Sequence, residues 1–430
     1  MPVPVGELEL SSATAPPETN SLGQISVLVR LHGAPLGVLN LLREPTDNKP
    51  DLVALAAERL EGPISEHLRR DGLTGIDALA RTSSAAAIRC SYGAAEPVDR
   101  ASVVVCTLGE DHRLRRTVDS ILAQSHGDLE LIVVDNQPAS GKVQRLLASV
   151  DDPRLRIVQE PRRGLSVARN TGLAVARSDF VAYTDDDAFA DPDWLRYLLA
   201  PFAEHPGIVC VTGLVLPAEL STAAQLLFEE FGAFDKGFER VVWTAQPDDE
   251  LARLGVMGEH GVLFPYSAGV FGSGNNMAFR TQWLRDSGAF DVALGAGTRA
   301  RGGEDLDAFL QVILAGRAII YEPHALVRHA GRADLAALRQ QMFGYGSGMS
   351  AVIAKHFLAS PGQGLGIVRR LPAGLRRLVD PASSKNEAKS DDFPAELSRA
   401  ELRGYAAGPA LYLQSRVRAR RANLHDPPRL

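Results

Sequence analysis

Short apolar runs alternate with amphipathic stretches between residues 101 and 187. Four continuous apolar runs have the length and composition of strands that are covered on both faces of a sheet. These runs are Ser102–Thr107, Leu129–Val134, Leu155–Val158 and Phe180–Thr184. The segments between them repeat apolar residues at helical spacing, namely Leu114–Ala123, Lys142–Ser149 and Leu165–Arg177. This alternation predicts right-handed βαβ units in a doubly wound, mostly parallel α/β sheet flanked by helices.

A small unit is predicted ahead of this sheet, over residues 21–71. Gln24–His32 and Leu36–Leu42 are strand-like runs separated by a turn, which together predict a hairpin. Asp51–Leu68 places its apolar residues at helical spacing. We therefore expect a β-β-α unit at this end of the chain.

Three other segments differ from these units in composition. Residues 1–20 are rich in Ser, Thr, Pro and Glu, which predicts disorder, and residues 72–100 are rich in Ala, Ser and Gly, which predicts a linker. Residues 331–430 are predicted to form a helical, basic C-terminal region that begins with a helix at Asp334–His356.

Residues 188–330 are less regular than the segment before them. They contain an expected strand at Ile208–Leu216, a Gly-rich segment at Ser267–Ala278 and an expected helix at Asp305–Ala315. We expect them to form the second half of the domain that begins at Ala101.

The charge of the 430-residue chain is unevenly distributed. Its net charge is −6, which gives no support for nucleic-acid binding. Residues 361–430 nevertheless hold thirteen Lys and Arg against seven Asp and Glu, so this end is basic and the remainder acidic.

The cysteines and apolar runs favour a cytoplasmic protein. Cys90, Cys106 and Cys210 are too few and too scattered for a disulfide framework or a metal cluster. Cys106 and Cys210 lie in apolar runs and are expected to be reduced core thiols. The N-terminus has no basic segment ahead of an apolar core, and no apolar stretch reaches the length of a bilayer span.

Three consecutive aspartates, Asp185, Asp186 and Asp187, follow the fourth apolar run. Like charges packed together are unfavourable unless a cation lies between them. Paired carboxylates suit a hard divalent ion such as Mg²⁺ or Mn²⁺, and the carboxyl ends of strands are where open α/β sheets bind ligands. A solvated acidic turn is the alternative interpretation.

Two further acidic positions accompany this triplet. Asp135 ends the second apolar run, and Glu304 and Asp305 lie between Gly302-Gly303 and a predicted helix. A doubly wound sheet would bring Asp135 and the triplet to one edge. The later pair could then close over the site as a general base.

Seven short motifs in residues 101–330 together resemble those of family 2 glycosyltransferases of the GT-A fold. They are VVVCT at Val103–Thr107, VVDN at Val133–Asn136, GLSVARNTGL at Gly164–Leu173, YTDDD at Tyr183–Asp187, GSGNNMAFR at Gly272–Arg280, GGEDLD at Gly302–Asp307, and Arg328-His329. The resemblance covers about half of the chain. It implies a nucleotide-sugar-binding half over residues 101–187 and an acceptor-binding half over residues 188–330.

The resemblance also implies individual roles. Asp305, with Glu304 beside it, falls on the position of the catalytic base, and the Asp-X-Asp motif falls on Asp185 and Asp187. Asp187, Asp185 and His329 would bind the metal, Mn²⁺ or Mg²⁺. Residues that would contact the nucleotide-sugar donor are Thr107, Asp135, Arg169, Asn170, Asp185 and Asp186.

The chemistry of an inverting transfer is consistent with this arrangement. The acceptor hydroxyl loses its proton as it attacks, so a carboxylate is needed on the face opposite the leaving group. A nucleoside diphosphate leaves with growing negative charge, which a divalent metal offsets. The Gln-X-X-Arg-Trp motif of processive members is absent after Asp305. We therefore expect one or a few sugars to be added to a glycan or lipid-linked acceptor.

Simpler interpretations exist for several of these residues. Asp135 could cap a helix, and Glu304-Asp305 could satisfy the free N–H groups of the helix that they begin. His329 could be a packed, hydrogen-bonded histidine, and Arg169 a surface helix residue.

Two other functions remain open for the chain as a whole. A sugar-1-phosphate nucleotidyltransferase would share the architecture, although the acidic stretch Leu108–Asp111 argues against a triphosphate loop. A non-catalytic sugar- or nucleotide-binding scaffold is the alternative that involves no reaction.

The basic segment Ile367–Val379 alternates apolar residues with arginines. It could lie on an anionic membrane surface near a lipid-linked acceptor, at the cytoplasmic face. Pro372 and Gly374 interrupt its pattern, which favours a solvated or interdomain segment.

Overall fold

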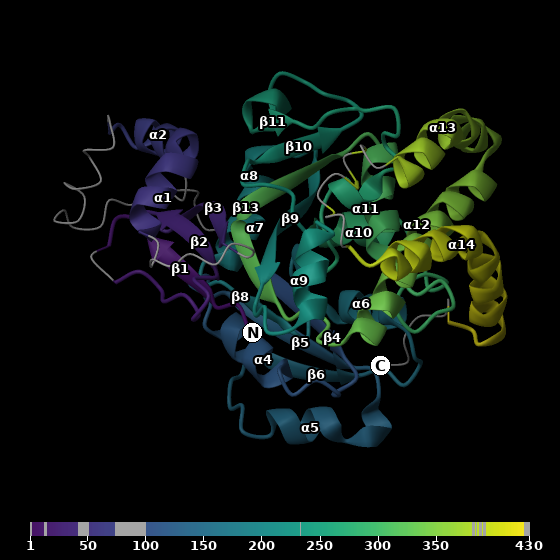
Figure 1. The fold of residues 1–430 in the computed structure, drawn as a ribbon. Helices are drawn as coiled ribbons and strands as arrows, with labels where there is room; N and C mark the ends of the chain where they lie inside the picture. The colour runs from purple at the N-terminus through teal and green to yellow at the C-terminus, as the bar shows by residue number, and fades with distance from the viewer. Residues whose placement is uncertain are drawn as a thin grey trace.

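The structure is a computed structural model, shown in Figure 1, and its described residues are 2–12, 15–41, 51–73, 100–232, 234–380, 383, 385–386, 389 and 393–424. A ten-stranded mixed sheet lies at the centre and is flanked by helices. A three-stranded sheet packs at one side, and three long C-terminal helices pack at the other. The expected α/β class, with a small N-terminal unit and a helical C-terminal region, is confirmed. Most of the expected linker, including Cys90, lies outside the described residues.

The described residues of the N-terminal unit form three strands and two helices. They are β1 (Val5–Glu9), β2 (Ile25–Leu31), β3 (Ala34–Leu41), α1 (Leu52–Arg59) and α2 (Glu61–Arg70). Strands β2 and β3 form the expected antiparallel hairpin, and β1 adds to β2 in parallel. The expected disorder of residues 1–20 is therefore wrong for β1. Backbone hydrogen bonds to β2 order this strand, and the composition of the segment does not reveal them.

Four parallel strands form the first half of the central sheet. They are β4 (Ala101–Thr107), β5 (Leu129–Asp135), β6 (Leu155–Gln159) and β7 (Phe180–Asp185). The helices between them are α4 (Leu114–Leu122), α5 (Lys142–Leu147) and α6 (Leu165–Val175), with a 3₁₀ turn at Pro138–Ser140 before α5. All seven expected elements of this βαβ series hold to within two residues at each end; β4, β5 and β7 are buried on both faces, whereas the edge strand β6 is only partly buried.

The second half of the sheet mixes strand directions. Its strands are β8 (Ala188–Ala190), β9 (Ile208–Pro217), β10 (Val241–Thr244), β11 (Val256–Met257), β12 (Asn276–Arg280) and β13 (Ala318–His329). Strand β12 runs antiparallel between β7 and β9, whereas β13 runs parallel to β9. The helices are α7 (Trp194–Leu199), α8 (Pro201–Glu204), α9 (Ala223–Glu230), α10 (Thr281–Asp286) and α11 (Glu304–Leu314), with 3₁₀ turns at Leu251–Arg253 and Ala268–Val270.

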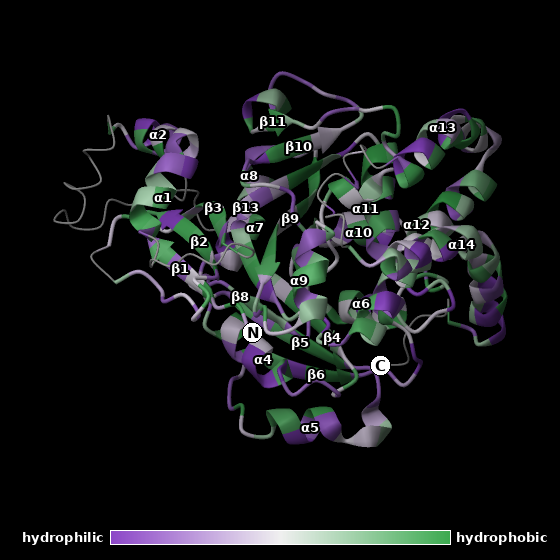
Figure 2. Cartoon of the chain, viewed as in Figure 1, coloured by the Kyte–Doolittle hydropathy of each residue, from purple (hydrophilic) through white to green (hydrophobic). Residues whose placement is uncertain are grey.

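Apolar side chains fill both faces of this sheet, and its strands carry the hydrophobic colour in Figure 2. Successive residues of a strand point to opposite faces. Accordingly, Val103 and Val105 pack in one cluster with Val118 of α4, while Val104 packs in the other with Ala168 of α6. Because packed side chains cover both faces of the sheet, a ligand can approach the strands at their carboxyl ends.

Three long helices follow β13: α12 (Leu335–Ala359), α13 (Pro361–Val379) and α14 (Ala395–Arg421). Helices α12 and α14 approach closely because glycines face the partner backbone; a Cβ on Gly346 would lie 2.1 Å from the carbonyl oxygen of Glu401. Helix α13 continues through Pro372 and Gly374. Within the described residues, none of the helices combines the length and apolar character needed to cross a bilayer.

Candidate active site

The acidic turn after β7 directs its three carboxylates to different partners. Asp186 accepts a hydrogen bond from the hydroxyl of Thr107 at the end of β4. Asp187 lies beside His329, with 3.3 Å between its Oδ1 and the ring Nε2, and Asp185 lies 3.5 Å from the guanidinium of Arg169. The three like charges are therefore distributed among separate partners instead of forming one solvated turn.

Asp185, Asp187 and His329 form a cluster with the composition of a metal site. Their nearest ligand atoms all lie within 4.8 Å of one another. The pairing of β8 with β13 sets this geometry, because it places His329 opposite Ala188, the residue after Asp187. Two carboxylates and an imidazole are ligands that suit Mn²⁺ or another divalent ion.

The electrostatics of the cluster also favour a cation. Burial alone would raise the pKa of Asp187, but the neighbouring His329 holds that pKa below its ordinary value. Burial likewise disfavours the charged ring of His329, yet Asp187 raises the pKa of His329. Burial raises the pKa of Asp185, with a further contribution from the charge of Asp187. A bound divalent ion would relieve the repulsion between these two carboxylates.

Asp305 lies in the first turn of α11 and points toward the start of β12. Its Oδ2 accepts a hydrogen bond from the backbone N–H of Gly274 at 2.9 Å, and its Oδ1 accepts one from the N–H of Leu306 at 2.8 Å. A Cβ on Gly274 would lie 2.9 Å from both Cβ and Oδ2 of Asp305. Glycine is therefore required for this close approach.

The loop before Asp305 packs directly on α12. Gly303 has a left-handed φ of +94°, and a Cβ there would lie 2.7 Å from the carbonyl oxygen of Gly348. Gly348 in turn faces the backbone of Gly302. Contact between glycines thus fixes the entrance to α11, and with it the position of Asp305.

Arg169 connects the two acidic positions. It is only 3% exposed and donates to Glu304 Oε1 and to the carbonyl oxygen of Gly274, each at 2.9 Å, while it also faces Asp185. Burial and the charge of Asp305 raise the pKa of Glu304 to about 7, against the opposing effect of Arg169. The interpretation of Arg169 as a surface residue is therefore wrong, and Glu304 is turned toward Arg169.

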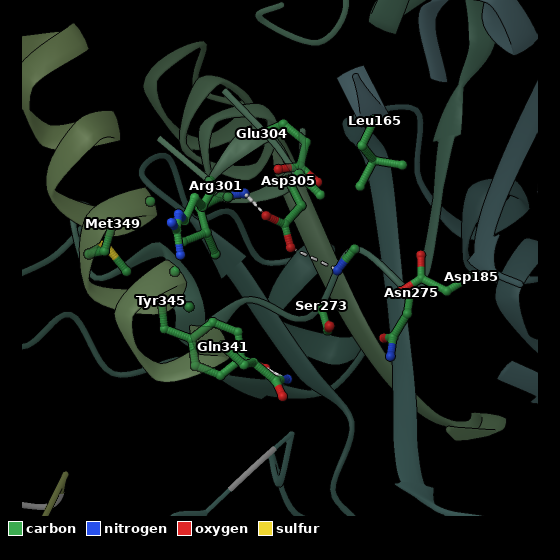
Figure 3. A pocket seen from close by; sticks show the side chains of 18 of the residues that line it. Leu165, Asp185, Ser273, Asn275, Arg301, Glu304, Asp305, Gln341, Tyr345 and Met349 are labelled. Atoms are coloured by element: carbon green, nitrogen blue, oxygen red, sulfur yellow. Dashed lines mark hydrogen bonds between the residues drawn. The ribbon is translucent and has the colours of Figure 1, made fainter. Parts of the chain in front are cut away.

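A cavity of about 790 Å³ unites these groups. Asp185, His329 and Asp305 line it together. In Figure 3, Asp305 lies between Asp185 on one side and the α12 side chains on the other. Residues of the far wall that the sequence did not single out are Arg301, Arg332, Gln341, Tyr345 and Met349. No motif marks them, because they come from a loop and from α12, outside the matched segments.

Thr107 and Asp135 lie side by side at the ends of β4 and β5. Asp135 is fully buried; its Oδ1 accepts from the N–H of Gln137, and its Oδ2 is buried without a hydrogen-bond partner among the described residues. Next to it, the Nδ2 of Asn136 donates to the carbonyl oxygens of Glu160 and Arg162. Asn136 therefore shapes the loop that follows β6.

Asn170 is not brought to this site. Its Nδ2 donates to the carbonyl oxygen of Phe290 at 2.8 Å, and its Oδ1 accepts from the N–H of the same residue at 2.9 Å. Both ends of the amide are thus used to hold the backbone of Phe290. The expected donor contact gains no support from this position, which lies outside the lining of the cavity.

The sequence profile of the glycosyl transferase family 2 matches residues 102–244, which include the acidic turn. This segment is therefore similar to glycosyl transferase family 2. The expected family resemblance is therefore confirmed, and Asp185, Asp186 and Asp187 lie within the family 2 segment.

Curated relatives of the family 2 segment are also glycosyltransferases. One is the glucosyl-dolichyl phosphate glucuronosyltransferase of Haloferax volcanii, 35% identical over 147 residues, or 32% of this chain and 47% of the relative. Another is the pre-mycofactocin glycosyltransferase of Mycobacterium tuberculosis, 26% identical over 264 residues, or 59% of this chain and 48% of the relative. The chain spans about half the length of these two relatives.

A solved mannosyltransferase from Pyrobaculum calidifontis, in complex with GDP-Man and Mn²⁺, has a similar chain path. The TM-score is 0.44 at 20% identity, covering 85% of this chain and 96% of that one. A likeness this distant does not assign a donor to this chain.

Proposed function

We propose that the chain is an inverting, metal-dependent, non-processive glycosyltransferase that moves a sugar from a nucleotide-sugar donor to a hydroxyl of a glycan or lipid-linked acceptor. The observation that carries the proposal is the shared cavity, in which two groups of the metal cluster, Asp185 and His329, lie with Asp305. An inverting displacement needs a metal–diphosphate site and a base that stand apart, with the sugar between them.

Asp305 is the general base in this proposal. It is only partly buried and faces the cavity, and two backbone N–H groups fix its carboxylate. A carboxylate held in this way can accept the proton of an acceptor hydroxyl without first being ordered. Glu304 is a positioning residue, because its carboxylate accepts a hydrogen bond from Arg169 and is not directed to the centre of the cavity.

Asp187, Asp185 and His329 would hold the divalent ion, Mn²⁺ or Mg²⁺. When bound, this ion offsets the negative charge that develops on the leaving diphosphate. Thr107 and Asp135 are the proposed contacts for the nucleoside. Their place at the carboxyl ends of β4 and β5 supports that role, because this is the edge where open α/β sheets bind ligands; both side chains are buried and lie outside the lining of the cavity.

The acceptor would enter along the wall formed by α12. Arg301 and Arg332 supply positive charge there, and Tyr345 and Gln341 supply aromatic and amide groups suited to a sugar or a phosphate-linked acceptor. The far wall is therefore more favourable for a polar or anionic acceptor than for a hydrocarbon chain.

A donor screen tests this proposal. Thermal unfolding of the full chain with UDP-, GDP- and dTDP-sugars, with and without Mn²⁺, should reveal one donor that raises Tm only when the metal is present. Sugar transfer from that donor to an acceptor, with an inverted anomeric product, would establish the reaction. Metal-dependent binding of a sugar nucleotide without transfer to any acceptor would instead favour a binding scaffold, and retention of configuration would contradict the inverting mechanism.

We further propose that helix α13 rests on an anionic phospholipid surface at the cytoplasmic face. Five apolar side chains recur every three or four residues along this helix and are each more than half exposed: Leu365, Val368, Leu371, Leu375 and Val379. The exposed Arg369 and Arg376 lie on the same helix. An apolar stripe beside cationic side chains complements anionic headgroups over an acyl layer.

Vesicle flotation tests this second proposal. Replacing Leu371 and Leu375 with Glu should lower partitioning onto vesicles of anionic phospholipid by about tenfold or more, because each buried leucine contributes about 1.5 kcal/mol or more. Val53→Glu, at an apolar side chain of α1 in the N-terminal unit that is 46% exposed, is the matched control and should float as the native protein does. Equal flotation of all three proteins, or none by the native protein, would remove the proposal.

A further inference from the structure

A second group of ligand-type side chains lies far from the cavity, in the N-terminal unit. His32 lies in the β2–β3 turn, while His67 and Asp71 lie four residues apart at the end of α2. Their ligand atoms meet at one point: His32 Nδ1 is 3.2 Å from His67 Nε2 and 2.8 Å from Asp71 Oδ2, and His67 Nε2 is 3.1 Å from the same oxygen. The three side chains are only 3%, 9% and 1% exposed.

Hydrogen bonding alone does not satisfy this triangle. If both rings donate to Asp71, two N–H groups face each other at 3.2 Å. If His32 donates to His67 instead, the lone pair of His67 is used for that bond and can offer nothing to the carboxylate at 3.1 Å. With Asp71 ionised, each arrangement of protons therefore leaves one unfavourable contact between buried atoms.

The same triangle suits three ligands of one tetrahedral metal ion. Zinc–ligand bonds of about 2.0–2.1 Å at tetrahedral angles place neighbouring ligand atoms about 3.3 Å apart. The observed separations of 2.8, 3.1 and 3.2 Å are close to that spacing. Two imidazoles and one carboxylate are a ligand set that zinc commonly uses.

The surroundings hold the three groups in place. His32 has a left-handed φ of +54°, rare outside glycine, and the turn that it makes with Gly33 is clamped by Glu9, whose carboxylate accepts from both backbone N–H groups. With Gly33 at a φ of +83°, this is the backbone of a two-residue hairpin turn, which fixes the place of His32 next to α2.

We infer that His32, His67 and Asp71 form a structural Zn²⁺ site that joins helix α2 to the β2–β3 turn. A unit this small has little core of its own, and small units commonly use a metal as a cross-link. The unit also carries ion pairs to the main domain, such as Arg30 to Asp191 at 2.5 Å. The metal would thus stabilise the surface that packs against the central sheet.

Cobalt substitution tests this inference on the full chain. After removal of metals with a chelator, Co²⁺ should bind with the intense visible d–d bands of a tetrahedral site. His67→Ala and Asp71→Asn should each abolish these bands, whereas His112→Ala, at a side chain that is 86% exposed, should keep them. Asp187→Ala should also keep them, which separates this site from the cavity cluster, where more oxygen ligands favour higher coordination.

Two controls decide the outcome. Far-UV circular dichroism identifies a variant that has lost its fold. In the Asp187→Ala background, which removes the cavity cluster, Zn²⁺ should raise the Tm; adding Asp71→Asn should abolish this increase, whereas adding His112→Ala should not. Absence of tetrahedral bands in the native protein would overturn the inference and leave a hydrogen-bonded triad. Bands that persist in folded His67→Ala would overturn it as well. Neither result would affect the proposed sugar transfer, which depends on other residues.

Discussion

Two three-residue clusters of this chain can each hold a cation, but their settings differ. Asp185, Asp187 and His329 lie at the carboxyl edge of the central sheet, and two of them line a large cavity. His32, His67 and Asp71 lie in a closed position between a turn and a helix, with nearly all of their surface buried. The first cluster leaves room for a substrate, whereas the second leaves little room beyond the ion.

The two clusters also differ in their ligand atoms. The cavity cluster has two carboxylates, whose oxygens suit a hard ion that keeps open positions for a diphosphate. The N-terminal cluster has two imidazoles and one carboxylate, a set that holds Zn²⁺ with one further ligand such as water. The two proposed sites thus differ in both cavity access and carboxylate content.

Asp187→Ala should have the largest effect on activity, and it should disturb the cavity cluster but not the N-terminal cluster. Loss of a metal ligand removes several kcal/mol of transition-state stabilisation, so kcat/KM should fall about 10³-fold. Asp71→Asn should keep kcat/KM near the native value at a temperature where it is folded, and should lower Tm. Steady-state transfer assays and thermal unfolding of both variants measure this contrast. Equal losses of activity would contradict the separation of roles.

Arg169→Ala should destabilise the fold strongly. Its removal leaves Glu304 and Asp185 without their buried cation, which costs about 3–5 kcal/mol. Arg115→Ala is the matched control, because its partner Asp119 is exposed and the pair contributes less than about 1 kcal/mol. Denaturant unfolding measures both, and similar losses in the two variants would show that Arg169 does not link the acidic positions.

Asp307→Asn should reveal a purely structural ion pair in α11. Asp307 accepts from Lys355 at 2.7 Å and from His356 at 2.9 Å. Burial opposes the ionisation of Asp307, but these partners hold its pKa below the ordinary 3.8. The folded state therefore binds fewer protons, so this stabilisation is fully present above pH 3.8 and is lost as the pH falls through the folded value.

The variant should consequently be less stable than the native protein by about 2–3 kcal/mol at neutral pH. The difference in unfolding free energy should shrink in strongly acidic solution, where Asp307 becomes protonated in both states. Denaturant unfolding across this pH range measures it, and a difference that is independent of pH would show that charge is not the cause.

Gly303→Ala should have the smallest effect on stability but a clear one on turnover. The left-handed φ and the 2.7 Å approach to Gly348 should cost about 2 kcal/mol and shift Asp305. Gly302→Ala is the natural control, because its Cβ would lie at an ordinary 3.5 Å from Gly344. If both variants transferred sugar at the native rate, the glycine contact would not position the base.

The sequence predicted one half of the main domain better than the other. Strands β4, β5 and β7 are buried on both faces, and local βαβ crossovers join them and the partly buried edge strand β6, so apolar runs alone identify these strands. Strand β12 lies in a Gly-rich segment, and β13 contains Pro323 in its middle. Their places depend on distant partners, namely β7 for β12 and β8 with β9 for β13, which no local pattern reveals.

The same distinction holds for the site residues. Asp185, Asp187 and Asp305 were predictable because each belongs to a short motif at a strand or helix end. The burial of Arg169 and the amide contacts of Asn170 depend on Gly274 and Phe290, more than 100 positions away. The His32, His67 and Asp71 group was missed because its residues are common and their spacing matches no motif considered from the sequence.

Asp305→Asn tests most directly whether the acids of this cavity divide into a metal set and a base. The substitution keeps the size of the side chain and leaves Asp185, Asp187 and His329 unchanged. We expect Mn²⁺-dependent donor binding by calorimetry to stay within about twofold of native, while single-turnover transfer falls by about 10²- to 10⁴-fold. Turnover near the native rate would contradict the assignment of Asp305 as the base, and loss of donor binding would show that Asp305 belongs to the metal set.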